Sequence, residues 1–122
     1  MIDMRETIRL ARRSNGVKGG LPWSCYLFDG EFPGFDGHFP GQPVLPGVCM
    51  LQAAVVTLED WLVRSIRIQE ISRARFVSPL GPGQELEVRC IQYKQADGVC
   101  RAHLALRGAG DRKTSECTLQ FI

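Results

Sequence analysis

One histidine of the 122-residue chain lies in a segment whose residue types favour a rigid loop. His38 belongs to residues 37–47, which read GHFPGQPVLPG. Proline fixes φ and glycine permits close backbone approach, so we expect this loop to hold the imidazole in one place. An imidazole titrates near neutral pH and is a natural general base.

The residues after this loop predict a helix that begins at Gly47. Pro46 suits the first turn of a helix, and most residues from 47 to 63 are apolar. The first N–H groups of that helix, at Gly47 and Val48, would point toward whatever His38 faces. A base beside such donors suits removal of a proton next to a carbonyl, because the N–H groups stabilise the developing enolate. On the residues alone, the alternative that His38 belongs to a purely structural loop remains open.

Composition supports the importance of this loop and narrows the class of protein. The chain has 13 Gly and 7 Pro, and nine of these lie between residues 30 and 47. Apolar residues at 44% and charged residues at 23% exclude a disordered or fibrous chain. A formal net charge of +2 is too small to indicate a nucleic-acid partner.

Cysteine and histidine usage predicts a reduced protein without a metal site. Five cysteines are scattered without paired spacing, only two histidines are present, and no apolar signal region begins the chain. The longest apolar run, residues 48–63, is interrupted by polar residues and falls short of a membrane span. We therefore expect a cytoplasmic protein with no membrane-spanning segment.

The elements that must position the histidine are one buried helix and several strands. The helix expected over residues 47–63 is apolar on nearly every side, so other elements must surround it. Alternation with period two predicts antiparallel strands, with a hairpin turn at Asp97-Gly98, over residues 70–77, 85–90, 100–107 and 116–121.

The segment ahead of the loop has two interpretations. Residues 7–13 alternate and residues 23–28 read as extended, which predicts a first hairpin. The alternative is a short N-terminal helix, because Asp3 and Glu6 have the spacing of a capping box.

Three segments together carry a resemblance to a known family. Residues 36–47, residues 71–76 (ISRARF) and residues 79–86 (PLGPGQEL) resemble the 3-hydroxyacyl-acyl-carrier-protein dehydratases of the FabA/FabZ type. The string Gly-His-Phe-Pro-Gly-x-Pro-x-x-Pro-Gly is a specific signature, and the likeness extends over about residues 23–122. It implies an α+β hot-dog fold, in which a curved antiparallel sheet wraps one long buried helix, with residues 1–122 as a single domain.

The resemblance also implies a reaction and an assembly. Such enzymes remove water from a 3-hydroxyacyl thioester carried on the phosphopantetheine arm of acyl carrier protein, in fatty-acid or related acyl-chain synthesis, without a further cofactor. They are homodimers or larger assemblies of dimers, with sites at the dimer interface. By likeness, His38 takes the α-proton, the N–H of Gly47 holds the thioester oxygen with Val48 beside it, and the carbonyl of Val44 orients the histidine.

One position departs from the family. By the resemblance, a carboxylate from the helix of the partner subunit helps the hydroxyl leave as water. It is expected fourteen residues after the histidine, and that position holds Gln52. An amide cannot donate a proton as a carboxylic acid does, and loss of a general acid typically costs about 10²- to 10⁴-fold in rate. Because an amide on an apolar helix needs polar partners, we interpret Gln52 as lining the site where the carboxylate would stand.

Three functions remain open at this point. The first is a dehydratase or hydratase in which His38 is the only acid and base and Gln52 holds water. The second is a catalytically impaired homologue that binds acyl carrier protein or pairs with an active subunit. The third is a hot-dog acyl thioesterase.

Docking of an acidic carrier protein would need a basic surface. Four arginines lie close together in the sequence, and we expect either a docking patch or an ordinary solvated face from Arg64, Arg67, Arg73 and Arg75.

Overall fold

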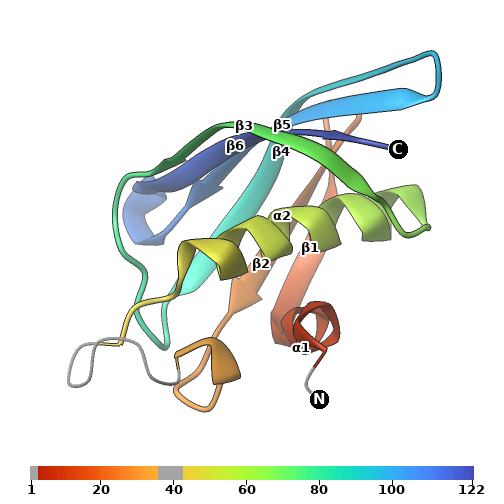
Figure 1. Cartoon of the computed structure of the whole chain (residues 1–122). Helices are drawn as coiled ribbons and strands as arrows, with labels where there is room; N and C mark the ends of the chain where they lie inside the picture. Colours follow the sequence, from red (N-terminus) through yellow and green to blue (C-terminus); the bar gives the residue numbers. More distant parts are fainter. Residues whose placement is uncertain (1–2, 36–42) are drawn as a thin grey trace.

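The computed structural model describes residues 3–35 and 43–122, in which two helices are each followed by strands (Figure 1). The main elements are α1 (Met4–Ala11), β1 (Arg12–Lys18), β2 (Leu21–Leu27), α2 (Gly47–Leu62), β3 (Ile68–Phe76), β4 (Glu85–Ala96), β5 (Val99–Arg107) and β6 (Lys113–Phe121). Within this described part, no helix has the length and apolar character needed to cross a membrane. The cytoplasmic location inferred from the sequence stays a prediction.

The strands form one antiparallel sheet that curves around α2 (Figure 1). The strand order is β1-β2-β4-β5-β6-β3, so β1 and β3 are its edges. Asp97 and Gly98 both have positive φ and turn the β4–β5 hairpin, as the sequence predicts. The expected α+β hot-dog architecture, with one long helix inside a curved sheet, is confirmed.

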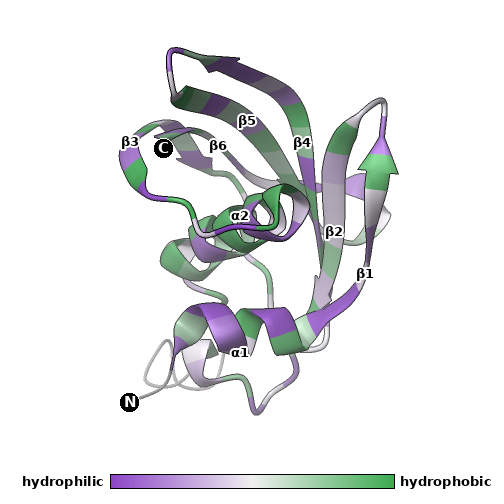
Figure 2. Ribbon diagram, turned by 90° about the vertical axis from the view of Figure 1, so that its right-hand side faces the viewer, coloured by the Kyte–Doolittle hydropathy of each residue, from purple (hydrophilic) through white to green (hydrophobic). Residues whose placement is uncertain are grey.

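The helix α2 is buried because apolar residues occupy most of its circumference. Nine of its sixteen residues are buried, from Cys49 to Glu59. The sheet covers one side through inward-facing residues such as Leu86, Val88 and Leu104, all of which have no exposed surface. Helix α1 covers another side, where Ile8 is fully buried (Figure 2).

The predicted strand over residues 7–13 is wrong, and the alternative of a short helix is correct. Asp3 is the N-cap of α1, and its carboxylate accepts from the N–H groups of Arg5 and Glu6. The alternation of Ile8 with its neighbours suggested a strand, but Leu10 is 76% exposed and takes no part in the core. The hairpin therefore begins only at β1 and turns through two glycines at positions 19 and 20, both with positive φ.

A buried carboxylate connects the two helices. The side chain of Glu59 on α2 is 3% exposed and accepts from Arg5 Nη1 at 2.9 Å and Arg9 Nη2 at 2.8 Å. It also accepts from the N–H of Ile66 at 2.9 Å, which fixes the chain after the helix. Beside it, Asp60 accepts from Arg9 and Arg12, so α1 and the start of β1 are held to α2 by charge as well as by apolar contact.

Removing both arginines should destabilise the fold more than removing the charge that they surround. The double variant Arg5→Met/Arg9→Met leaves a buried carboxylate without a cation, and we expect the free energy of unfolding to fall by about 3–5 kcal/mol. Glu59→Gln keeps the shape and an acceptor for Ile66, so a loss of only about 1–2 kcal/mol is expected. Urea unfolding measures both losses.

Arg13→Met is the control, because Arg13 is exposed and no ion pair with a described residue involves it. It should change stability by less than about 0.5 kcal/mol. A double variant no less stable than Glu59→Gln would contradict a structural role for this cluster.

Candidate active site

The candidate site is built around the start of α2. His38 and the rest of residues 36–42 lie outside the described residues, so the predicted general base is not placed. The second described range begins at Pro43, four residues before Gly47. Helix α2 begins at Gly47, as predicted.

The first turn of α2 keeps its N–H donors uncapped by any side chain. Pro46 is the N-cap residue, with extended backbone at φ −61° and ψ 148°, and proline offers no polar side-chain atom. Its carbonyl accepts from the N–H groups of Cys49 at 3.0 Å and Met50 at 3.3 Å. The N–H groups of Gly47 and Val48 precede these bonds and have no acceptor within the helix. Among the described residues they have no acceptor, so they can bind a negatively charged oxygen.

Backbone hydrogen bonds hold the segment ahead of α2 in place. The N–H of Leu45 donates to the carbonyl of Leu80 at 2.7 Å. The N–H of Gly83, three residues further on, donates to the carbonyl of Phe28 at 2.8 Å. The loop that leads into the helix is thus tied to the loop that follows β3 and, through it, to the end of β2.

A cleft of about 480 Å³ lies between the start of α2 and the segment after β3. Its two walls are Val44, Leu45, Pro46, Gly47 and Met50 on one side and Phe76, Val77, Ser78 and Pro79 on the other. Apolar side chains predominate. The hydroxyl of Ser78 donates to the carbonyl of Lys113 at 2.6 Å. The cleft suits an apolar chain whose polar end meets the helix N-terminus.

Of the predicted substrate-binding residues, the cleft contains Val44 and Gly47 but not Val48. Val48 lies next to it with 62% of its surface exposed. The sequence alone did not predict the second wall, which Phe76 begins. The only signal was that Phe76 ends the segment 71–76, which carries part of the resemblance. The neighbouring Cys49 is 2% exposed, and burial raises the pKa of its thiol, so it acts as a small apolar residue.

Gln52 has a hydrogen-bond partner that the sequence did not reveal. Its Oε1 accepts from Nε of Arg5 at 3.3 Å, and the side chain is not among those that line the cleft of its own chain. The interpretation of Gln52 as a residue of the reaction site stays a prediction. Glu59, two turns further along α2, is held by its arginines and is not available as a substitute acid.

The four candidate docking arginines do not form one compact patch. Arg64 and Arg67 lie in the connection between α2 and β3, whereas Arg73 and Arg75 lie in the second half of β3. All four are exposed, and Arg75 contacts Glu116 at 3.5 Å. At about 3.3 Å per residue, Arg67 and Arg75 are roughly 26 Å apart along the strand. Their role in docking stays a prediction.

A curved antiparallel sheet around one long helix, with a cleft at the N-terminus of that helix, defines the hot-dog class. The chain belongs to the ApeI-like family, because the family model described as ApeI dehydratase matches residues 21–116. This segment contains the described walls of the cleft and the loop that carries His38.

Individual relatives agree with this assignment. The 3-hydroxyacyl-[acyl-carrier-protein] dehydratase FabZ of Latilactobacillus sakei is 35% identical over 97 residues, covering 72% of this chain and 67% of that enzyme. FabZ of Agrobacterium fabrum is 31% identical over 85 residues, covering 64% of this chain and 55% of the relative. The matched part thus spans between about half and two thirds of the length of these relatives.

Solved structures support the fold. The dehydratase heterocomplex ApeI:P from Xenorhabdus doucetiae superposes with a TM-score of 0.73 at 21% identity, covering 90% of this chain and 95% of that one. A hypothetical thioesterase with coenzyme A from Streptococcus pneumoniae gives a TM-score of 0.70 at 8% identity, covering 97% and 91%. At these identities the likeness concerns the fold alone.

Gly47 is required by the close approach of Phe76 to the helix. A Cβ atom at position 47 would lie 2.7 Å from the Phe76 ring. We therefore expect Gly47→Ala to lower the free energy of unfolding by up to about 1 kcal/mol, because the half-exposed ring must leave its position. In a Phe76→Ala background the same substitution should cost nothing, which a double-mutant cycle by urea unfolding measures.

Gly30→Ala is the matched control, since a Cβ there meets no atom within 4 Å. An equal cost of Gly47→Ala in both backgrounds would show that contact with Phe76 is not what demands glycine.

Proposed function

We propose that this chain catalyses the dehydration of a 3-hydroxyacyl thioester, as part of fatty-acid or related acyl-chain synthesis. The observation that carries the proposal is the uncapped N-terminus of α2 at one end of an apolar cleft, directly after the His38 loop. Membership in a family of dehydratases is consistent with it.

The chemistry follows from where charge develops. His38 removes the α-proton, and the electrons of the broken C–H bond first form an enolate. In a second step these electrons form the carbon–carbon double bond as the C3–O bond breaks. The transient negative charge on the thioester oxygen is stabilised by the N–H groups of Gly47 and Val48. The departing hydroxyl takes the proton back from His38, so the products are a 2-enoyl thioester and water. The carbonyl of Val44 would hold the imidazole in the required orientation.

Gln52 would act by hydrogen bonding rather than by proton donation. Its Oε1 accepts from Arg5, and the two N–H bonds of the amide, which have no acceptor among the described residues, would hold a water molecule or the leaving hydroxyl. Without a carboxylic acid, the step depends on His38 both as base and as acid.

The substrate would reach the cleft on the phosphopantetheine arm of an acyl carrier protein, and no other cofactor is needed. The apolar walls suit the acyl chain. Two of the candidate docking residues, Arg73 and Arg75, lie on β3 close to Phe76, which is part of one wall of the cleft. Arg64 and Arg67 precede β3 and are further from that wall along the chain.

A second candidate is an impaired homologue that pairs with an active subunit. Two points favour it: Gln52 stands where the resemblance places the family carboxylate, and the solved ApeI:P neighbour is a heterocomplex. The thioesterase alternative rests on fold similarity alone.

Activity on an enoyl or 3-hydroxyacyl thioester separates these functions. We expect wild type to interconvert the two, and His38→Ala to lower kcat/KM by at least about 10²-fold. Interconversion can be followed by the absorbance of the enoyl thioester. Release of free thiol without enoyl formation would favour the thioesterase.

Gln52→Glu would test whether the chain is an impaired homologue, but Arg5 binds the side chain at position 52 and would affect the new carboxylate. A new carboxylate 3.3 Å from Arg5 would be held ionised and could not donate a proton, so Gln52→Glu/Arg5→Gln is the informative variant. Gln95→Glu, at an exposed position of β4, is the control for added charge. An inactive wild type that gains histidine-dependent activity in the double variant would replace the first proposal by the second.

We infer that the chain forms a dimer, or a larger assembly of dimers, through the free edge of β3. Exposed apolar side chains concentrate there: Ile71 is 47% exposed, Phe76 53% and Val77 55%. Phe76 and Val77 also line the cleft, so a partner strand at this edge would cover the open side of the site. The other edge, β1, exposes a single large apolar residue, Val17.

Charge introduced at the two edges should have different effects on assembly. Ile71→Lys places an ammonium group in the expected interface and should give a monomer, whereas Val17→Lys should leave the mass of the assembly unchanged. Light scattering coupled to gel filtration measures both. A dimeric Ile71→Lys or a monomeric wild type would contradict assembly through β3.

A further inference from the structure

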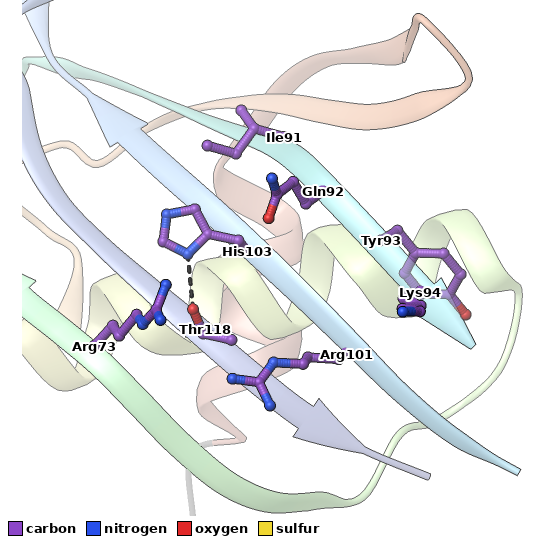
Figure 3. Close-up of a pocket in the computed structure, with 8 residues that line it drawn as sticks. All are labelled: Arg73, Ile91, Gln92, Tyr93, Lys94, Arg101, His103 and Thr118. Carbon is purple, nitrogen blue, oxygen red and sulfur yellow. Dashed lines mark hydrogen bonds between the residues drawn. The ribbon is translucent and has the colours of Figure 1, made fainter. Parts of the chain in front are cut away.

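A second cavity lies on the face of the sheet that points away from α2. It has a volume of about 590 Å³, and we call it the outer hollow. Figure 3 shows His103, Thr118 and Arg101 in front of the strands and α2 behind them, whereas Tyr93 packs against Trp61 of α2. It shares no lining residue with the cleft at the start of α2. Its lining includes Arg73, Ile91, Gln92, Arg101, His103 and Thr118.

Two β-bulges flank the outer hollow. On one side, the β3–β6 register shifts between Ser72 and Arg75, and Arg73 between them has φ of +51°. On the other side, the β4–β5 register shifts between Cys90 and Gln92. Bulges redirect side chains, and a non-glycine residue with positive φ costs about 1–2 kcal/mol. The cavity therefore lies where the regular sheet is interrupted on both sides.

Positive charge gathers here without a counter-charge. Arg73, Lys94 and Arg101 line the outer hollow, and none of them forms an ion pair with a residue in the described ranges. No Asp or Glu lines it. Three like charges around one cavity repel each other, and an anion inside it would remove that repulsion.

The nearest carboxylate is already occupied. Glu116 contacts Lys113 at 2.8 Å and Arg75 at 3.5 Å, and it lies 3.5 Å from His103 Nε2. The hydrogen bond from Lys113 holds the pKa of Glu116 below its usual range. Its charge is thus balanced by cations that are not part of the outer hollow.

The floor of the outer hollow is polar. His103 Nδ1 and Thr118 Oγ1 are 2.7 Å apart, and Thr118 is 5% exposed (Figure 3). Gln92 stands opposite His103 in the β4–β5 register and adds an amide. Ile91, 47% exposed at the rim, offers an apolar surface. The lining therefore combines cations, hydrogen-bonding groups and one apolar contact.

We propose that the outer hollow is a binding site for an organic phosphate, separate from the cleft at α2. Guanidinium groups bind phosphate oxygens through two parallel N–H bonds, which makes arginine better suited to this anion than a single point charge. The volume exceeds that of a phosphate group and lies in the range of small-molecule sites, so the ligand carries an organic part that contacts Ile91. Pairing through the edge of β3 would leave this face open.

Titration calorimetry with ADP and with inorganic pyrophosphate tests the site. We expect saturable binding of ADP by wild type, weaker binding of pyrophosphate, and at least about tenfold weaker ADP binding by Arg73→Gln/Arg101→Gln. ADP should also raise the Tm of wild type but not that of this variant. The affinity for coenzyme A is measured in the same way. Tighter binding of coenzyme A than of ADP would identify the organic phosphate as a thioester carrier, and tighter binding of ADP would identify it as a free nucleotide.

Arg13→Gln/Lys18→Gln is the matched control, because it removes the same charge from exposed positions on β1. It should bind ADP within about twofold of wild type. Absence of saturable binding, or equal weakening in both double variants, would overturn the proposal, since the latter indicates attraction by net charge alone. Equal affinity for pyrophosphate and ADP would overturn the part that assigns an organic moiety.

Discussion

The contact between Glu59 and the two arginines of α1 is the interaction on which this arrangement depends. The helix α2 is apolar on nearly all sides, and the sheet alone covers only part of it. Helix α1 closes another part, but it has only eight residues and contributes a single fully buried side chain, Ile8. A helix of this length gains little stability by itself, so its position must come from tertiary contacts. The buried carboxylate supplies these by accepting from two residues of α1 and from Ile66.

The two ends of α2 thus have different tasks. The C-terminal end carries the charges that hold the fold, whereas the N-terminal end has no side-chain cap and directs its N–H groups toward an apolar cleft. Gln52 lies between them and is connected to Glu59, since Arg5 binds both side chains at once. An amide at this position can share Arg5 with Glu59 without adding a further charge. A carboxylate there would compete for the same guanidinium group, which offers a physical reason for an amide at this position.

Much of the fold follows from local patterns in the sequence. The apolar run from Gly47, the alternating strands and the Asp97-Gly98 turn each encode their element within a few residues. The error over residues 7–13 arose because the alternation of a few residues fits a strand as well as one face of a short helix, and only the capping by Asp3 separates them. The second wall of the cleft, the partner of Gln52 and the outer hollow were not predictable. Each joins residues from distant parts of the chain, such as Gly47 with Phe76 or Arg73 with Arg101. The second wall depends on a close contact and the outer hollow on β-bulges, and neither produces a periodic pattern in the sequence.

The central claim is that His38 removes the proton next to the thioester carbonyl while the start of α2 stabilises the resulting charge. Exchange in D2O tests this step separately from the loss of water, which is where Gln52 enters. A 3-hydroxyacyl thioester incubated with the wild-type protein in D2O should gain deuterium at the α-carbon, as measured by mass spectrometry, and His38→Ala should abolish the gain. Folded wild type that leaves the α-carbon unlabelled, or equal labelling by wild type and His38→Ala, would contradict the account.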